Sequence, residues 1–189
     1  IACADGLALS DAGPLPTDLT SVSGLAASRL QDGVVWAVED SFEPADLVAL
    51  GTDGRELGRV RVQGGPLANL DWEDLAITDG PDGVPQVYVA DIGDNLSVRP
   101  SVQLYVFDEP SPDDDSADPR VIQATYEDLT GRTVRPNAEA LVVQDGVVWI
   151  LDKQPDGPAT LYRMEPTAGG AHRGILTADQ PFVQALHRQ

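Results

Sequence analysis

The sequence has little cysteine, little positive charge and no long apolar run. Its one cysteine is Cys3, so the chain cannot close a disulfide on itself and the rest of it has no thiol chemistry. Lysine and arginine number 12 against 31 acidic residues, which gives a formal net charge of -19. A surface this acidic repels nucleic-acid phosphates and attracts cations, so we expect no nucleic-acid partner. A general compositional bias toward acidic residues, which the single lysine at Lys153 fits, is an alternative source of most of this charge.

The apolar stretches fall short of the roughly 18 residues that a membrane-spanning helix needs, so we expect no transmembrane segment. The chain begins at Ile1 rather than Met, and Ile1-Ala2-Cys3 resembles the end of a lipobox, in which the cysteine of a bacterial lipoprotein is lipidated. We predict that residues 1–20 form an export or linker segment, with a lipid anchor at Cys3 and an extracellular or cell-envelope location. The alternative is an N-terminal cysteine with no special role.

A pattern of short apolar segments recurs three times along the chain. The segments are rich in β-branched and aromatic residues and are bounded by Asp-Gly turns, as is typical of antiparallel strands. We expect strands at residues 23–26, 34–40, 47–50 and 58–62 in the first copy, 73–77, 87–91, 104–107 and 121–126 in the second, and 139–143, 147–152, 161–164 and 174–176 in the third. No segment has the pattern of an amphipathic helix, so the sequence predicts an all-β protein.

Three copies of about four antiparallel strands indicate the blades of a β-propeller over residues 21–177. Propellers close with four or more blades, so about three blades predict an incomplete ring. A sandwich or jelly roll is the competing all-β fold, although it does not require the copies to resemble one another. Residues 178–189 have lost the pattern and are expected to be an irregular tail. The aromatic residues that occupy matched places in the second strands, Trp36, Tyr88 and Trp149, are expected to pack in the core.

Acidic residues recur at the same points of the repeat. Glu73 and Glu139 lie at the entry to the first strand of their copies, and an aspartate closes each second strand, namely Asp40, Asp91 and Asp152. In a propeller blade these two points lie at the same face, so we expect all five side chains to meet at the mouth of the central channel. Further oxygen-bearing residues lie in the same loops: Asn69, Asp71, Asp94, Asn95 and Asn137.

Carboxylates that converge on one place raise one another's pKa unless a cation balances them. Ca²⁺ binds about six to eight oxygen atoms of carboxylates, amides and carbonyls in a flexible geometry, and those are the donors present. We therefore predict a site for Ca²⁺ or another hard divalent cation at Glu73, Asp91, Asp94, Asn95, Glu139, Asp40 and Asp152. Zinc is disfavoured because both histidines, His172 and His187, lie in the irregular C-terminal part and no thiolate is near.

Structural roles compete with this interpretation. Aspartate at the end of a strand often accepts hydrogen bonds from its own turn, which is our expectation for Asp32, Asp53, Asp82 and Asp145. The recurrence of an aspartate at the end of each second strand is also explained by one structural bond repeated in each blade. The run Asp113-Asp114-Asp115 is expected to be a solvated loop.

Four motifs resemble those of secreted bacterial propeller proteins, which are distantly similar to the esterase-like phytase and gluconolactonase (senescence marker protein) families. The motifs are Ser23-Gly24-Leu25-Ala26, Asp71-Trp72-Glu73-Asp74-Leu75-Ala76, Asp91-Ile92-Gly93-Asp94-Asn95 with Arg99, and Asn137-Ala138-Glu139-Ala140-Leu141. The resemblance covers roughly residues 20 to 165. It implies a divalent cation in the central channel, with Glu73 and Glu139 as ligands and, more loosely, Asp91, Asp94 and Asn95.

Two classes of function follow from these features. The first is a metal-dependent hydrolase of a lactone, ester or phosphoester, in which the cation polarises the substrate oxygen and a carboxylate acts as general base. The second is a non-catalytic extracellular module that binds a small-molecule or cell-envelope ligand and uses calcium structurally. An acidic scaffold with no specific metal is a third reading. The repeated part offers no Ser-His-Asp or Cys-His set, so triad chemistry is disfavoured.

Overall fold

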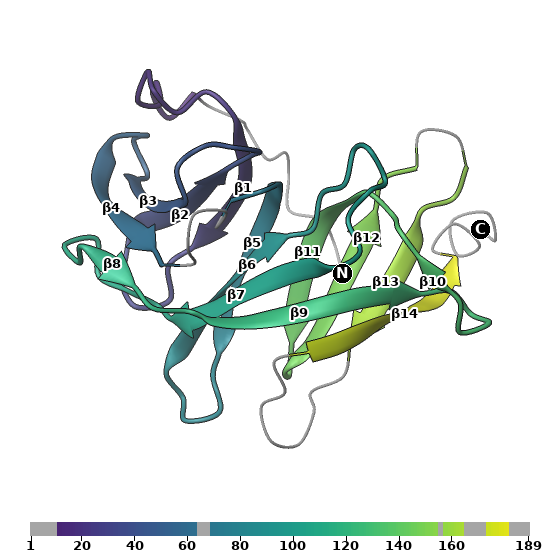
Figure 1. The fold of residues 1–189 in the computed structure, drawn as a ribbon. Coiled ribbons are helices and arrows are strands. Elements are labelled where there is room, and N and C mark those ends of the chain that lie inside the picture. Colours follow the sequence, from purple (N-terminus) through teal and green to yellow (C-terminus); the bar gives the residue numbers. More distant parts are fainter. Residues whose placement is uncertain (1–10, 64–68, 155–156, 165–172, 182–189) are drawn as a thin grey trace, which may run out of the picture.

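The computed structural model describes residues 11–63, 69–154 and 157–164, and the backbone of residues 173–181 (Figure 1). These residues form fourteen β-strands and no helix, in one sheet of five strands and one of nine. The predicted all-β class is confirmed. Within the described residues there is thus no helix with the length and apolarity to cross a membrane.

Each of the three copies forms a four-stranded antiparallel unit whose strands pair in chain order. Unit one contains β1 (Val22–Ala27), β2 (Val34–Glu39), β3 (Asp46–Gly51) and β4 (Glu56–Val62). Unit two contains β5 (Trp72–Asp79), β6 (Pro85–Asp91), β7 (Val102–Asp108) and β9 (Arg120–Glu127). Unit three contains β11 (Ala138–Gln144), β12 (Val147–Asp152), β13 (Thr160–Met164) and β14 (Arg173–Pro181). All twelve predicted strands are present.

The Asp-Gly pairs form the turns between these strands. Asp145 and Gly146 both have positive φ, 52° and 75°, in the two-residue connection between β11 and β12. Positive φ at both central residues is the mark of a type I′ hairpin turn, which glycine and aspartate tolerate. Asp53 accepts a hydrogen bond from the backbone N–H of Arg55, as expected of a turn aspartate.

The units stack in the same orientation, so that the same face of each unit meets the opposite face of the next. Each contact between units contains a hydrophobic core. One face of unit one, which includes Trp36 and Leu47, packs against the face of unit two that includes Leu75 and Tyr105. The opposite face of unit two then packs against unit three, where the rings of Tyr126 and Tyr162 meet edge to face with centroids 4.8 Å apart. Apolar burial between the four-stranded units therefore holds the stack together.

The outer strands also join neighbouring units. The short strand β8 (Ser116–Ala117) pairs in parallel with β4, and β14 pairs in parallel with β9 before it pairs with β13. The two-residue strand β10 (Thr133–Val134) pairs with β9. These pairings satisfy outer-edge backbone groups that an isolated four-stranded unit would leave open. The described residues form an open stack and no closed ring.

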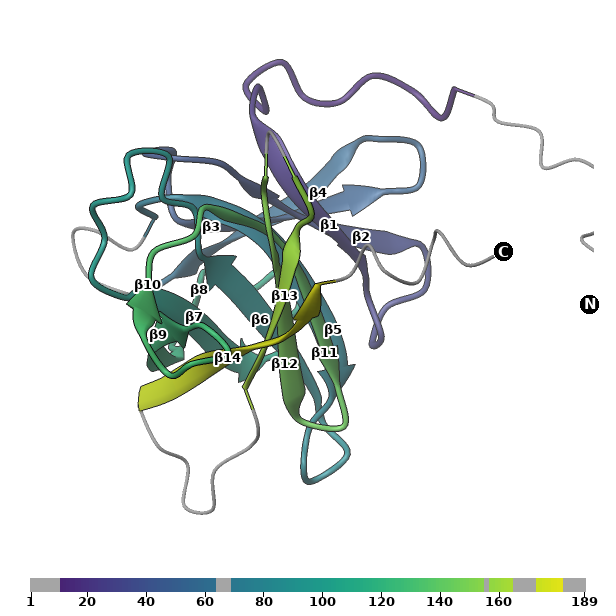
Figure 2. The same cartoon turned by 90° about the vertical axis from the view of Figure 1, so that its right-hand side faces the viewer.

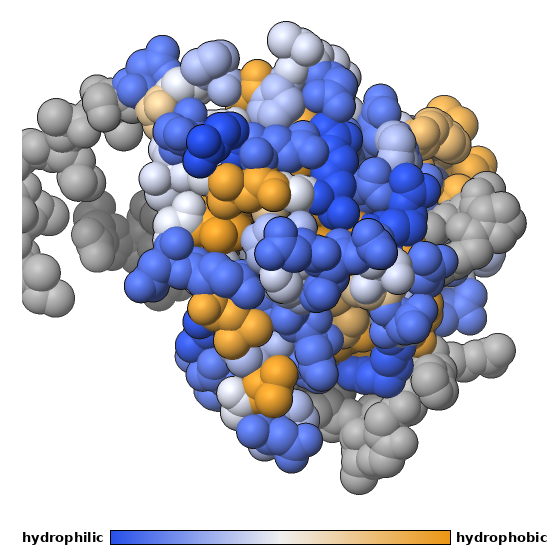
Figure 3. Space-filling view, turned by 90° about the vertical axis from the view of Figure 1, so that its left-hand side faces the viewer, coloured by the Kyte–Doolittle hydropathy of each residue, from blue (hydrophilic) through white to orange (hydrophobic). Residues whose placement is uncertain are grey.

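The two ends of the stack differ. At unit one, Leu19 from the segment before β1 packs over Ala37, Val48 and Leu50, and this side of the molecule is mainly hydrophilic, with apolar residues in small separate groups (Figure 3). At unit three the outward face of β11 to β13 faces the viewer in Figure 2 with no further sheet over it among the described residues.

This outward face changes the prediction for the three aromatic residues. By strand register Trp149 matches Tyr88 and Trp36. Trp36 and Tyr88 are buried in the two cores, but Trp149 is only partly buried and lies under the guanidinium of Arg163, 5.5 Å from the ring centroid. The prediction of core packing was therefore wrong for Trp149, because its face of unit three has no neighbouring sheet among the described residues.

Candidate metal site

A β-bulge in each first strand fixes the position of the glutamates. The registers of β1, β5 and β11 shift at the same place, and the residue passed over is Ser23, Glu73 or Glu139. A bulge leaves one residue outside the regular pairing and redirects its side chain. Because β5 packs beside both β1 and β11, the bulges bring Glu73 and Glu139 together. Their equivalence, predicted from the sequence, is confirmed.

Three carboxylates from two units form the core of the site. One oxygen each of Asp40, Asp71 and Glu73 lie within 4.8 Å of one another. Asp71 and Glu73 are buried, with 7% and 6% of their surfaces exposed, and Asp40 is half-buried. The hydroxyl of Ser41 lies within hydrogen-bond distance of both Asp40 and Asp71 and can donate its one proton to either, so it holds the loop after β2 against the start of β5. We call Asp40, Asp71, Glu73 and Glu139 the carboxylate cluster.

Glu139 extends this cluster from unit three, and Lys153 forms an ion pair with it. Lys153 Nζ lies 2.9 Å from Glu139 Oε1, and the amide of Asn137 donates to the same oxygen at 3.1 Å. The charge of Lys153 also acts on Glu73 and Asp40, since all three carboxylates raise the pKa of the ammonium. One ammonium thus faces several carboxylates, and the cluster keeps an excess of negative charge.

Crowding and burial shift the acidities within the cluster. Burial, with the charges of Glu139, Asp40 and Asp71, raises the pKa of Glu73 to about 8. Burial and the neighbouring Asp40 also raise the pKa of Asp71. Although burial opposes it, hydrogen bonds from Ser41 hold the pKa of Asp40 below its ordinary value. Without a cation, Glu73 therefore keeps a proton at neutral pH, because a further negative charge there is too costly.

Gly93 leaves the space in which two of these carboxylates lie. A Cβ on Gly93 would fall 2.4 Å from Asp71 Oδ2 and 2.4 Å from Glu73 Oε1. The backbone N–H of Gly93 donates to the carbonyl of Asp71 at 3.2 Å, which fixes this close approach. Any side chain here would displace the carboxylates, so the backbone after β6 forms one wall of the cluster.

The register corrects the supposed equivalence of the three aspartates. Val22 pairs with Glu39, Trp72 with Asp91 and Ala138 with Asp152. Glu39, not Asp40, is thus the counterpart of Asp91 and Asp152, and Asp40 lies one residue beyond. The error arose because Val-Glu-Asp ends the second strand of the first copy with two acidic residues, and apolar pattern alone does not choose between them.

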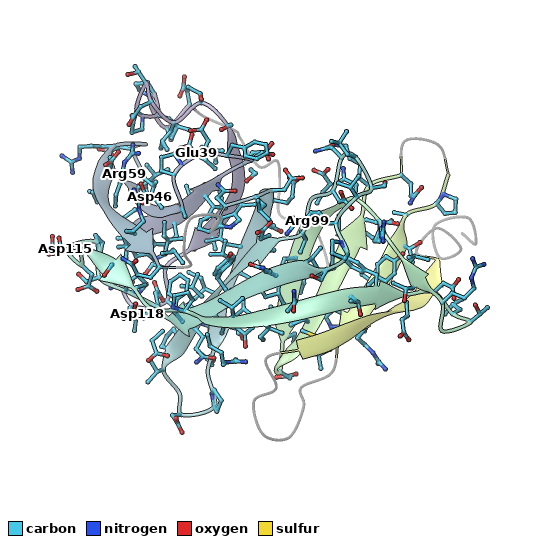
Figure 4. The ribbon with its side chains drawn as sticks, viewed as in Figure 1. Glu39, Asp46, Arg59, Arg99, Asp115 and Asp118 are labelled. Atoms are coloured by element: carbon cyan, nitrogen blue, oxygen red, sulfur yellow. The ribbon has the colours of Figure 1, made fainter. Side chains whose placement is uncertain are left out.

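Glu39 and Asp91 have the same structural task. Glu39 accepts the backbone N–H groups of Thr20 and Ser21, just before β1, and Asp91 accepts that of Asp71, just before β5, at 3.1 Å. The alternative of one structural bond repeated in successive units therefore holds for this pair. In Figure 4 Glu39 and Arg99 lie toward the upper ends of the sheets, away from Asp115 and Asp118.

The loop after β6 is held by two charged side chains. Arg99 pairs with the fully buried Asp91 at 2.7 Å and donates to the carbonyls of Gly93 and Asp91. Asp94 accepts the backbone N–H groups of Val98 and Arg99, each at 2.9 Å. Both carboxylates thus help to hold the loop in place. Burial nevertheless raises the pKa of Asp91, although Arg99 opposes this shift.

The remaining predicted ligands are spread around the cluster. The exposed Asn95 accepts a hydrogen bond from Asn137 at 3.2 Å, which links the loop after β6 to the start of β11. The buried Asp152 accepts hydrogen bonds from the backbone N–H of Thr160 at 2.5 Å and from Gln154 at 2.7 Å, so it ties β12 to β13. Cys3, His172 and His187 lie outside the described residues.

The sequence did not reveal the roles of two acidic residues, Asp71 and Glu109. Asp71 was noted only as a loop residue; its spacing of two from Glu73 is a signal that both side chains emerge on one side of an extended chain. Glu109 gave no signal, because it lies outside the repeated segments. It is 6% exposed and accepts hydrogen bonds from the indole N–H of Trp36 at 2.9 Å and from Ser28, so it fastens unit two to unit one.

Comparison with known proteins adds no family to this description. A scan against models of protein families gives no match, and a search among curated proteins finds none either.

Proposed function

We propose that the protein binds a divalent cation, Ca²⁺, at the carboxylate cluster, with Asp40, Asp71 and Glu73 as ligands and Glu139 beside them. The observation that carries this proposal is the approach of three carboxylate oxygens to within 4.8 Å, two of them from buried residues. Oxygen donors without nitrogen or sulfur favour a hard cation over zinc. Bound calcium would replace the proton on Glu73 and offset most of the remaining negative charge.

The space beside Gly93 supports this assignment. The bare backbone at Gly93 lets Asp71 and Glu73 approach from one side, while Ser41 orients Asp40 and Asp71 from the other. The carboxylates are therefore placed by contacts outside the cluster itself. Such an arrangement keeps like charges together at a cost, which a structural role alone does not require.

The two function classes differ in what the cation does. In a hydrolase of lactones, esters or phosphoesters, the cation supplies polarisation of the substrate oxygen, and a carboxylate of the cluster accepts a proton from water. In an extracellular binding module, the cation pins the loops after β2 and β6. The half-exposed position of Glu139, with 33% of its side chain accessible, leaves a side of the cluster open to a ligand, which favours the hydrolase.

We also propose that the stack is an arc of a β-propeller in an exported or envelope protein of the kind its motifs resemble. The repeated polarity supports this, since the same face of each unit packs on the opposite face of the next. The partly buried Trp149 then lies where a further blade would pack. A closed ring would place the carboxylate cluster at the channel mouth.

The test of the cation site is thermal unfolding with millimolar Ca²⁺ and with chelator. We expect Ca²⁺ to raise the Tm, because a ligand that binds only the folded state stabilises it. Glu73→Gln and Glu139→Gln should abolish the shift. The matched control is Asp53→Asn, in an exposed turn on the same unit as Asp40, which should keep it. Equal losses in all three variants would indicate diffuse charge relief, and an unchanged Tm in the wild type would remove the site.

Catalysis is tested separately with a panel of lactones, carboxylic esters and phosphoesters in the presence of Ca²⁺. Hydrolysis that disappears with chelator and in Glu73→Gln supports the hydrolase. Calcium binding without turnover of any of the three classes favours the binding module.

A further inference from the structure

The contact between units occurs twice within the chain, and one half of it is left over at each end of the stack. Leu25, Leu75 and Leu141 are equivalent, because each lies two residues after the bulge position of its first strand. Unit one covers Leu75 and unit two covers Leu141, which are 3% and 5% exposed. Leu25, on the outward face of unit one, is 58% exposed. Unit one thus presents the receiving half of the contact, and no other unit covers Leu25 in the part of the chain that the structure describes.

The outward face of unit three presents the other half (Figure 2). Trp149 lies opposite Val142 on β11 and Arg163 on β13, and residues directly opposite on neighbouring strands share a face of the sheet. Leu151 and its partner Leu161 extend this face, since side chains two residues apart along a strand point the same way. All five are partly or fully exposed, and Val142 is 56% exposed. They form one surface, whose counterparts in units one and two are covered by the next unit.

In this contact the first strands lie side by side, with β1 and β11 each beside β5. A Cβ on Gly24 would fall 2.8 Å from the Cα of Asp74 and 2.9 Å from the backbone nitrogen of Leu75, so β1 meets the backbone of β5 directly. At the equivalent place on β5, Asp74 accepts the backbone N–H of Leu141 on β11 at 2.7 Å. Ala140 is the matching residue of β11, and its small side chain leaves room for a further first strand to approach in the same way.

The segment before β1 leaves the first strand of unit one open to such an approach. Leu19 packs over Ala37, Val48 and Leu50, which lie on the second and third strands of that unit. It does not bury Leu25 on the first strand. The part of the outward face that remains exposed is therefore the part at which neighbouring units within the chain lie side by side.

We propose that the outward face of unit three binds the outward face of unit one in a second copy of this chain, with Trp149 and Val142 against Leu25 of the other copy. This rests on the proposed propeller arc and adds that a second copy supplies the further blades. Two copies of the three units make six, and propellers contain about four to eight blades, so the contact formed twice would close the ring. Head-to-tail contacts give a finite assembly only when they close, and three copies would contain nine units.

The charge of the chain sets the conditions for this dimer. Each copy has a formal net charge of -19, and the repulsion between two such copies opposes association. Apolar contact around Trp149, a residue type that often dominates the energy of protein interfaces, must overcome this repulsion. The dimer should therefore become tighter as salt screens the charges.

Sedimentation velocity of the full chain, over a range of concentrations and at high ionic strength, tests the second copy. We expect a mass twice that of one chain, in chelator as well as in Ca²⁺, because the contact lies on the outward faces of the stack rather than at the carboxylate cluster. A monomer at every concentration overturns the proposal.

Two variants with a matched control assign the contact. Val142→Asp and Leu25→Asp should each weaken dimerisation at least about tenfold, because each would bury an unpaired carboxylate between the copies. Both positions are exposed in the single chain, and circular dichroism checks that the fold is retained. Val84→Asp adds the same charge at a 44% exposed turn of unit two, both of whose faces are covered, and should leave the dimer unchanged. An equal loss in this control would show general charge repulsion and overturn the proposal.

An equimolar mixture of the two variants separates head-to-tail from face-to-face pairing. The Val142→Asp chain keeps Leu25, and the Leu25→Asp chain keeps the surface around Trp149, so one of the two contacts can form. The mixture should dimerise more tightly than either variant alone and less tightly than the wild type. If unit three pairs with unit three instead, Leu25→Asp alone dimerises normally and mixing gains nothing, which overturns the proposal.

Tryptophan fluorescence gives a second measure of the same surface. Trp36 and Trp72 are fully buried, so quenching by acrylamide reports mainly on Trp149. Quenching should be stronger in Val142→Asp than in the wild-type dimer, and equal quenching would show that the contact does not cover Trp149.

Calcium separates this inference from the proposed function. If Ca²⁺ raises the Tm of a chain that stays monomeric, the second copy is wrong and the cation site stands. If the chain dimerises and Ca²⁺ gives no shift, the cation site falls and the dimer stands. A face-to-face dimer counts against the propeller arc as well as the head-to-tail contact.

Discussion

Two groups of carboxylates occupy the same end of the sheets and differ in what they face. Glu39, Asp91 and Asp94 each accept backbone N–H groups and lie buried behind the loops. Members of the carboxylate cluster, such as Asp71 and Glu73, instead face one another. The comparison shows that the acids at the ends of β2 and β6 and in the loop after β6 serve the fold, whereas the cluster brings together residues of different units.

The largest effect should come from the first group. Asp91→Ala removes the buried partner of Arg99, and loss of one side of a buried ion pair typically costs about 3–5 kcal/mol. Urea unfolding of the calcium-free protein measures the difference in the free energy of unfolding. The double variant Asp91→Ala, Arg99→Met should recover part of it, because no buried charge then remains unpaired. A loss below that of Asp53→Asn would show that the pair is not structural.

A smaller loss of stability should come from Gly93→Ala, which affects the cluster only through steric contact. The new Cβ would meet the carboxylates of Asp71 and Glu73, and such overpacking costs about 1–3 kcal/mol. We further expect the calcium-induced rise in Tm to disappear, since the two carboxylates must separate. Gly83→Ala offers the contrast, because no atom lies within 4 Å of a Cβ there; its positive φ makes it mildly destabilising without any effect on calcium. Retention of the calcium shift in Gly93→Ala would count against this geometry.

An effect of opposite sign, which grows with pH, should come from Glu73→Gln without calcium. The pKa of Glu73 rises from an ordinary value of 4.5 to about 8 on folding, through burial and the charges of Glu139, Asp40 and Asp71. Between these values the folded chain keeps a proton that the unfolded chain has released, so stability falls as pH rises through this window. Glu73→Gln should remove this part of the pH dependence and be more stable than the wild type above pH 8, but not at pH 4. Parallel Tm–pH curves in chelator would contradict the shift.

The strands and their grouping could be predicted because their signals are local. Apolar alternation and Asp-Gly turns mark each strand, and the repeat marks each unit, so all twelve strands were found. The parallel pairing of β14 with β9 could not be predicted, because it depends on how neighbouring units sit side by side. Trp149 was wrongly assigned to the core because the sequence pattern of unit three is the same as that of unit two. The sequence does not show which faces of the units are covered by a neighbour.

The candidate site was predicted in part. Glu73 and Glu139 were found because the repeat places them at equivalent points, which the bulges confirm. Asp40 was named with the wrong counterparts, since the register makes Glu39 the residue that matches Asp91. Asp71 was not named as a ligand, because its role depends on the loop after β2 and on the bare backbone of Gly93, both distant from it in sequence.

The sequence by itself determined an acidic, all-β chain of three repeated units with carboxylates at one end of the strands, because strand period, turn residues and net charge are local properties. Only the tertiary structure decided which carboxylates support the fold and which face one another. That choice rests on strand register and on the stacking of units, where a shift of one residue exchanges Glu39 for Asp40. The excess of acid thus separates into buried hydrogen-bond acceptors and one crowded cluster, for which we propose a cation.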